Sequence, residues 1–530
     1  MRKILALLLA VAMVFVLAAC GGGTGEKDPG EGSTGEKQVV VGINADYSTF
    51  DPAHAYEKSS RMILHEVYET LFRFSAEDDA VIENDLAEDY TISEDGLTYV
   101  ITMRQDAKAV TGKILDAHDA EFCFKRLINL KGNPSFLADP IASVEATGDF
   151  ELTIKLKQPT PAILAILCDS AFSVYDSEAA QENGATLDPA TDSAQSFFDN
   201  NSIGSGPYKL VSYTPNVEVV MEKNEDYAGT SAKIDRVVFK HINDSSMQLM
   251  SLQKGDIDFA FDLTASQLET LTDENIIVRN YPTQDIFFLH MNVDETIGGP
   301  LANPDVRRAI AYAIDYEGLR ELAGNDPSTP MNIIPSGFPG YAGESKITRD
   351  LEKAKYYLEK AGYPDGFTFE CGAIPDMATD GIAFMDCAVK IQSDLKEVGI
   401  TMNIQADEVS VYLEKLRSAK YQANIGMWGP DYLDPASQLA FMPGETVGLR
   451  SNWTADMAPE LAELTAKAKV ETDPEKRAEL FKEIQIMYSE IPGPVIVFVQ
   501  PNRALAMSKR VKDVHYSSAY MLIFHLMDIE

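Results

Sequence analysis

Residues 421–435 hold the side chains whose types and spacing best suit binding chemistry. Residues 421–427 have the composition of a short strand. Gly429 and Pro430 end it, because glycine adopts backbone angles that other residues avoid and proline cannot donate to a ladder. Trp428 stands at the strand end and Asp431 follows three residues later. A large ring beside a carboxylate can receive a cationic ligand group, but a core tryptophan beside an ordinary aspartate turn has the same pattern.

No arrangement of residues in the chain supports catalysis. The seven histidines are scattered and form no recognisable metal pair. The stretch His65-Glu66-Val67-Tyr68-Glu69 resembles half of a zinc helix, but a glutamate stands where the second histidine is needed. Gly204-Ser205-Gly206 lacks the spacing of the Gly-x-Ser-x-Gly nucleophile turn. We therefore predict no catalytic residue, no metal site and no cofactor.

The amino terminus has the pattern of an export signal. Arg2 and Lys3 precede an apolar run of 16 residues, 4–19. That run is short for a membrane span, which needs roughly 20 residues, and is typical of a secretory signal peptide. Leu17-Ala18-Ala19-Cys20 matches a lipobox. This predicts a signal peptide over residues 1–19 and lipidation of Cys20, whose two or more acyl chains would suffice for stable anchoring.

Composition defines the rest of the chain. Residues 20–37 are rich in Gly, Glu and Thr and contain no large apolar side chain, so we expect a flexible tether. The remaining 490 or so residues exceed one ordinary core and predict two or three domains. The formal charge is −37, or −39 without residues 1–19, because only Arg2 and Lys3 are lost. Such a surface excludes nucleic-acid binding.

Four cysteines follow Cys20, namely Cys123, Cys168, Cys371 and Cys387. An exported chain can form disulfides, but so few cysteines do not make a disulfide scaffold. We expect buried thiols, and Cys371–Cys387 is the one bridge that merits a test.

Elements of both kinds alternate along the chain. Residues 38–43, 97–103 and 150–156 have strand patterns, residues 59–74 have near-helical apolar spacing, and Asp116 caps a helix over 116–130. Residues 209–261 mix hairpins with α-β alternation. Further on, Asn303 caps a helix, and helices over 351–361 and 388–398 end at glycines before β runs. This rhythm predicts two α/β bodies.

In this order, the segments resemble the peptide-type solute-binding proteins of ABC importers, the large oligopeptide, dipeptide and nickel-binding family. The resemblance covers nearly all of the chain after the tether. It is carried by Phe50-Asp51-Pro52, by the spacing of Asp116 to Arg126, by Gly204-Ser205-Gly206-Pro207-Tyr208, by Gln253-Lys254-Gly255-Asp256-Ile257-Asp258, by Asn303-Pro304-Asp305-Val306-Arg307-Arg308-Ala309-Ile310 with Ala313-Ile314-Asp315, and by Trp428-Gly429-Pro430-Asp431.

The resemblance implies an α/β fold of two lobes that close like a clamp, of the type II periplasmic-binding class with an extra inserted subdomain. Lobe I would comprise residues 38–285 and 495–530, with 75–195 as the inserted subdomain. Lobe II would comprise 286–494. The protein would be a lipid-anchored monomer on the outer face of the cytoplasmic membrane, and its partners would be a small peptide and the importer's permease and ATPase subunits.

The resemblance also implies site residues. Asp431 matches the aspartate that pairs with the peptide α-ammonium, and Trp428 matches the tryptophan beside it. An extended peptide would add a strand to residues 425–429, which include Met427 and Gly429. Tyr56, Glu57 and Lys58 would form the opposite edge.

The partner of the ligand carboxylate stays open among Arg417, Arg450, Arg307 and Arg308, and surface salt bridging is the alternative for each. Two other functions are also compatible with these residues. The fold could hold a non-peptide cargo such as a metal chelate, a sugar or an opine-like molecule. An extracytoplasmic hydrolase is the second alternative.

Overall fold

The computed structural model describes residues 36–45, 47–375 and 377–530. The predicted signal segment 1–19, the predicted lipidation site Cys20 and the tether up to residue 35 lie outside the described residues. Within the described ranges, no helix combines the length and the hydropathy that a membrane crossing requires.

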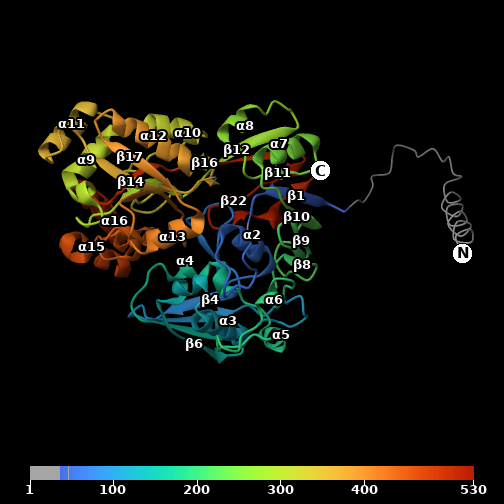
Figure 1. Cartoon of the computed structure of the whole chain (residues 1–530). Helices are drawn as coiled ribbons and strands as arrows, with labels where there is room; N and C mark the ends of the chain where they lie inside the picture. The colour runs from blue at the N-terminus through green and yellow to red at the C-terminus, as the bar shows by residue number, and fades with distance from the viewer. Residues whose placement is uncertain (1–35, 46, 376) are drawn as a thin grey trace, which may run out of the picture. The chain divides into compact units, whose positions relative to one another are not determined.

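A seven-stranded sheet organises the first body (Figure 1). Its order is β12 (Ile276–Pro282), β20 (Asn502–Ser508), β11 (Phe259–Ala260), β1 (Gln38–Ile43), β10 (Arg236–His241), β9 (Glu218–Lys223) and β8 (Tyr208–Thr214). In β1, Val39 and Val41 face one core while Val40 faces another, since side chains alternate along a strand. The sheet is therefore covered on both faces, and α7 (Ser245–Lys254) packs on the Val40 side.

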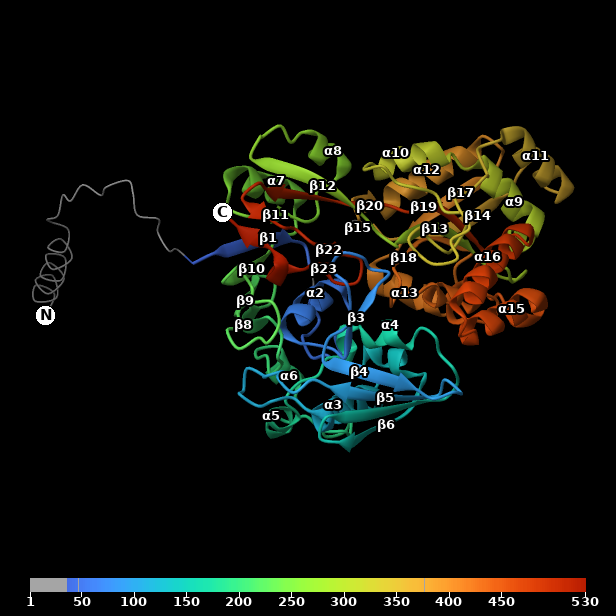
Figure 2. The same cartoon turned by 180° about the vertical axis from the view of Figure 1, so that it is seen from behind.

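A five-stranded sheet organises the second body. Its order is β17 (Thr401–Ala406), β14 (Thr368–Ala373), β18 (Ala423–Trp428), β13 (Ile286–Met291) and β19 (Val495–Val499). Figures 1 and 2 show α9 (Pro304–Ala313), α10 (Tyr316–Ala323), α11 (Leu351–Lys360) and α12 (Phe384–Lys396) on one side, with α15 (Pro459–Val470) and α16 (Pro474–Glu490) on the other. Phe287 and Phe288 of β13 accordingly enter opposite cores.

A four-stranded antiparallel sheet interrupts the first body. Its order is β4 (Ala87–Ile92), β5 (Thr98–Met103), β7 (Glu151–Leu156) and β6 (Ile141–Gly148). Helix α3 (Ala117–Leu130) lies in the connection between β5 and β6 and packs on this sheet through Phe124 and Leu127. Asp116 caps α3 by accepting from the backbone N–H of His118 and Asp119, as its position before the apolar face predicted.

Two chain crossings join the seven-stranded and five-stranded sheets, one between β12 and β13 and the other between β19 and β20. They are hydrogen-bonded to each other: Gln500 Nε2 donates to the Thr283 carbonyl over 2.7 Å, and Thr283 Oγ1 donates to the Pro501 carbonyl over 2.8 Å. The predicted lobe boundary at residue 495 needs correction. Residues 495–499 pair with β13 in the five-stranded sheet, so the chain returns at about residue 500.

Helix α2 is shorter than its apolar spacing suggested. A helix was predicted over residues 59–74, but α2 spans Lys58–Val67 and Phe72–Phe74 is strand β2. Pairing explains the difference, because β2 forms an antiparallel ladder with β3 (Ile82–Asn84), and a ladder satisfies its backbone as well as a helix would. All four cysteines after Cys20 are buried free thiols.

Candidate functional site

The predicted strand before Trp428 is confirmed as β18, shifted by one or two residues. β18 pairs along its whole length with β13 on one side. On the other side, β14 pairs only with Ala423 and Asn424. Beyond Asn424 this second edge therefore has no strand partner among the described residues, although the Ile425 carbonyl accepts from the hydroxyl of Tyr412.

Asp431 and Tyr56 meet although they come from different bodies. The hydroxyl of Tyr56, just before α2, donates to the Oδ1 atom of Asp431. Arg61 of α2 donates to the Asp431 carbonyl over 3.3 Å, and its guanidinium carbon lies 5.4 Å from the centre of the Tyr56 ring. Residues 428–431, at the end of β18, thus lie against Tyr56, which the family resemblance placed on the opposite edge of the site.

Burial and the neighbouring groups shift the pKa of Asp431 in opposite directions, and the net shift is upward. Burial raises the pKa of Asp431, while the hydrogen bond from Tyr56 and the charge of Arg61 lower it. Arg61 also lies 3.3 Å from the carboxylate of Asp169, which belongs to the inserted segment. A desolvated carboxylate with one neutral donor retains free acceptor capacity, so it can accept hydrogen bonds from a ligand cation.

Trp428 packs into the core of lobe II, which is one of the two roles that its sequence context left open. Its ring packs edge-on against Phe441 of the lobe core, with ring centres 5.5 Å apart. On its other side, the guanidinium carbon of Arg450 lies 5.9 Å from the ring centre. The indole Nε1 is buried without a hydrogen-bond partner among the described residues. Met427 is half-buried and packs on the opposite core of the same lobe.

Lys58 and Gly429 lie together at the buried carboxylate of Asp285. Asp285 lies immediately before β13. The Lys58 ammonium donates to both of its carboxylate oxygens over 2.7 Å. Burial raises the pKa of Asp285 to about 6, and the charge of Lys58 limits the rise. A Cβ atom on Gly429 would lie 2.7 Å from Lys58 Nζ and closer still to the Asp285 carboxylate. The absence of a side chain at Gly429 therefore makes room for this ion pair.

The other predicted residues are held by local contacts. Glu57 Oε2 accepts from the hydroxyl of Ser48 over 2.7 Å. Arg307 donates to three backbone carbonyls in the second body, and Arg308 donates to the Glu490 carbonyl. Arg450 differs from these arginines: its pKa is lowered by burial and by the charge of Arg417.

Three residues near Asp431 had no signal in the sequence. Arg61 and Asp169 form an ion pair across a separation of 108 positions, which no local pattern reveals. Phe136 is 40% exposed, and its ring lies 5.8 Å from that of Tyr56 in an edge-on arrangement. Only the folded arrangement of the inserted segment brings Asp169 and Phe136 to the site.

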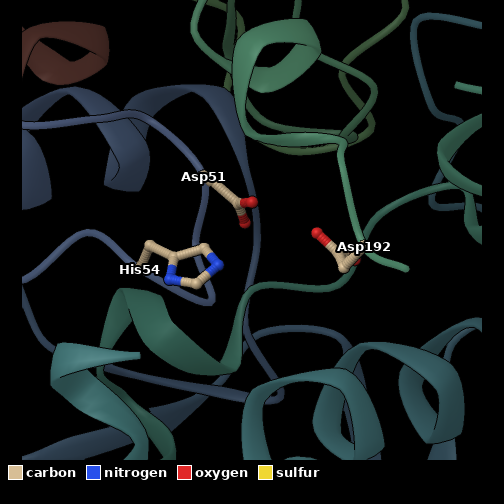
Figure 3. Close-up of side chains that lie close together, drawn as sticks. All are labelled: Asp51, His54 and Asp192. Carbon is tan, nitrogen blue, oxygen red and sulfur yellow. The ribbon is translucent and has the colours of Figure 1, made fainter. Parts of the chain in front are cut away.

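Asp51, His54 and Asp192 form a second cluster of potential ligand atoms (Figure 3). Arg126 of α3 already binds both carboxylates. Its Nη1 and Nη2 donate to Asp51 over 2.7 and 2.6 Å, and its Nε and Nη2 donate to Asp192 over 2.8 and 2.9 Å. The two carboxylates and Arg126 therefore form an ion triad that ties α3 to the Asp51-Pro52 turn.

Two sheet-centred lobes joined by two crossings define a type II periplasmic-binding fold. A dipeptide-binding protein from Pseudoalteromonas sp. SM9913, solved in complex with Met-Leu, shares this fold with a TM-score of 0.80 at 21% identity, over 93% of this chain and 100% of that one.

The family model for bacterial extracellular solute-binding proteins, family 5 Middle, matches residues 81–448. The chain belongs to that family. It is 27% identical over 497 residues to the probable D,D-dipeptide-binding periplasmic protein DdpA of Escherichia coli K12, covering 92% of this chain and 93% of the relative. It is 25% identical to the oligopeptide-binding protein OppA of Bacillus subtilis 168, over 92% and 93% of the two chains.

Proposed function

We propose that this protein captures di- or oligopeptides between its two lobes and delivers them to an ABC importer without chemical change. The observation that carries the proposal is the half-buried Asp431 at the end of β18, facing Tyr56 and Arg61 of the other lobe. Relatives that cover almost the whole chain carry the names of dipeptide-binding and oligopeptide-binding proteins, which supports the same cargo class.

In this proposal, the peptide α-ammonium binds the Asp431 carboxylate. Removal of water strengthens a pair of opposite charges and penalises an unpaired one. A free amine would then be required, because an acetylated amine cannot neutralise the buried anion. Trp428 forms one wall of this ammonium site.

The peptide backbone would pair with the open edge of β18 beyond Asn424, where β14 has ended. Pairing of this kind provides affinity through main-chain hydrogen bonds and leaves side-chain identity largely unread. Tyr56 and Glu57 would flank the peptide from the other lobe, whereas Lys58 would act through its bond to Asp285.

Arg450 and Arg417 would receive the ligand carboxylate. No carboxylate pairs with either guanidinium within ion-pair distance among the described residues, and the charge of Arg417, together with burial, lowers the pKa of Arg450. Two cations that lie near each other favour an anion between them. The position of Arg450 beside Trp428 suits a short peptide with both termini bound.

Outside the cleft, we propose that Cys20 carries the lipid anchor and that the protein works as a monomer on the outer face of the cytoplasmic membrane, where it meets the permease and its ATPase subunits. Membership of an extracellular solute-binding family supports this location.

Calorimetric titration of the full chain with Ala-Ala and with N-acetyl-Ala-Ala tests the proposal. We expect binding of the first, at least about a hundredfold weaker binding of the second, and loss of binding in Asp431→Asn. Asp456→Asn, an exposed change in the same lobe, is the matched control. Equal affinity for both peptides, or retained affinity in Asp431→Asn, would remove Asp431 from the site. Mass spectrometry of ligand released on denaturation would show peptide or non-peptide cargo.

A further inference from the structure

A cavity lies within lobe II, separate from the proposed peptide site at Asp431. It has a volume of about 150 Å³ and lies between α9, the end of α16 and the edge strand β19. A cavity of about this size in a protein core accommodates a benzene molecule. Ala311, Tyr316, Val495 and Val497 give it apolar walls, so it can hold a ring or a short aliphatic chain.

Two arginines of α9, Arg307 and Arg308, line the cavity, and none of the described residues that line it carries a carboxylate. This contrasts with a chain that has 82 acidic residues against 45 basic ones. Arg308 is partly exposed and lies 3.6 Å from the carboxylate of Asp305, which does not line the cavity.

Arg307 is buried without a carboxylate partner among the described residues. Its Nε and Nη2 donate to the Pro492 carbonyl, and its Nη1 donates to the carbonyls of Leu301 and Ala302. A guanidinium has five N–H groups, so one N–H on Nη2 has no acceptor among the described residues. Burial, reinforced by the charge of Arg308, lowers the pKa of Arg307 to about 10.

Aromatic rings complete the lining. Tyr312 and Tyr357 stack with an interplanar angle of 2° and ring centres 5.9 Å apart, and the guanidinium carbon of Arg308 lies 5.9 Å from the centre of the Tyr357 ring. Tyr488 accepts from the N–H of Val495 and donates to its carbonyl, which occupies the free edge of β19 at that point. The strand edge is thus satisfied there, whereas Arg307 has no carboxylate partner among the described residues.

We propose that this cavity is a second ligand site, which binds a small organic acid with an apolar body of about benzene size. The carboxylate would accept from the free N–H of Arg307 and from Arg308, which offsets the cost of a buried cation without an anion. The apolar body would fill the space between α9 and β19. This site is independent of the peptide site proposed between the lobes.

Titration of the full chain with sodium benzoate tests the proposal, with benzyl alcohol as the neutral probe of the same size. We expect benzoate to bind at least about tenfold more tightly than benzyl alcohol. Equal binding of the two probes would overturn the assignment of an anion site. Binding of neither would overturn the site itself.

Two variants locate the binding. Arg308→Met should weaken benzoate binding about tenfold, whereas Arg320→Met should leave it unchanged, because Arg320 pairs with Glu317 on α10 and does not line the cavity. Ala311→Phe should abolish binding by filling the space. Unchanged binding in Arg308→Met and in a folded Ala311→Phe would show that benzoate binds elsewhere.

The inter-lobe site serves as the last control. Asp431→Asn should retain benzoate binding in full, even where it loses the dipeptide. Loss of both ligands in Asp431→Asn would show that benzoate occupies the peptide site and would overturn the second site alone. Retained benzoate binding together with absent dipeptide binding in the unmodified chain would count against the peptide proposal only.

Discussion

The hydroxyl of Tyr56 donates a hydrogen bond to the carboxylate of Asp431, and so joins two residues that lie 375 positions apart and on different lobes. The bond places one neutral donor on the half-buried anion without neutralising its charge. It also makes the protonation of Asp431 depend on a residue of the opposite lobe.

Peptide affinity should therefore fall on mild acidification. Burial raises the pKa of Asp431 above that of an exposed aspartate. A ligand ammonium needs the ionised carboxylate, so affinity is full above this raised pKa and is lost as the pH falls through it. Below it, we expect a loss approaching tenfold per pH unit. Titration calorimetry with Ala-Ala over a pH series measures the midpoint.

Tyr56→Phe provides the control for this pH dependence. The Tyr56 hydroxyl lowers the pKa of Asp431, so its removal should move the midpoint of the binding curve to higher pH. The same change made at Tyr356, which is 60% exposed in lobe II, should leave the midpoint where it was. A midpoint that does not move in Tyr56→Phe would contradict the coupling between the two residues.

Local elements were predictable because their signals are local. Asp116 and Asn303 cap helices where their sequences place them, and β18 ends at the Gly429-Pro430 break. The end of α2 at Val67 was not predictable, because it depends on the ladder between β2 and β3 rather than on apolar spacing.

The contacts of the site follow from how the lobes meet, and the sequence alone does not contain that information. The spacing from Trp428 to Asp431 indicated a binding corner, and the resemblance indicated Tyr56. Neither indicated that Lys58 would bind Asp285, which lies 227 positions away, or that Arg61 would pair with Asp169. Residues that act through long-range pairs require the fold.

Arg126 provides a stability test. Its side chain is fully buried and binds two carboxylates. Arg126→Met would leave Asp51 and Asp192 buried without their counter-ion, so we expect a loss of about 3–5 kcal/mol in the free energy of unfolding. Arg320→Met, at the exposed ion pair with Glu317, should cost less than about 1 kcal/mol. Urea unfolding measures both.

The loss of stability in Arg126→Met should also depend on pH, in a direction that the ion triad fixes. Burial alone would raise the pKa of Asp192, but hydrogen bonds from Arg126 hold this pKa below its ordinary value. In the unmodified chain, this contribution is present above the unfolded pKa and is lost as the pH falls through the folded pKa. Without Arg126, burial should raise the pKa of Asp192, so the deficit of the variant should shrink on acidification. A deficit independent of pH would contradict the ion-triad account.

Substitution of Gly429 tests whether this residue is needed for packing at the Lys58–Asp285 ion pair or for peptide binding. Gly429→Ala places a Cβ atom against Lys58 Nζ and the carboxylate of Asp285, which is almost fully buried. Overpacking of this kind costs about 1–3 kcal/mol. Gly148→Ala is the control, because its Cβ would meet only Glu151 Cβ at an ordinary 3.5 Å. Thermal unfolding of both variants should show a lower midpoint for Gly429→Ala alone.

A double-mutant cycle with Lys58→Met identifies the cause of that loss. Once Lys58 has been removed, the Asp285 side chain can move away from the new Cβ, so the second substitution should cost less than it does in the unmodified chain. We expect a coupling free energy of about 0.5–3 kcal/mol from the unfolding curves. Additive costs would show that Gly429 is required for another reason, and a loss of Ala-Ala binding at unchanged stability would place it in the peptide site instead.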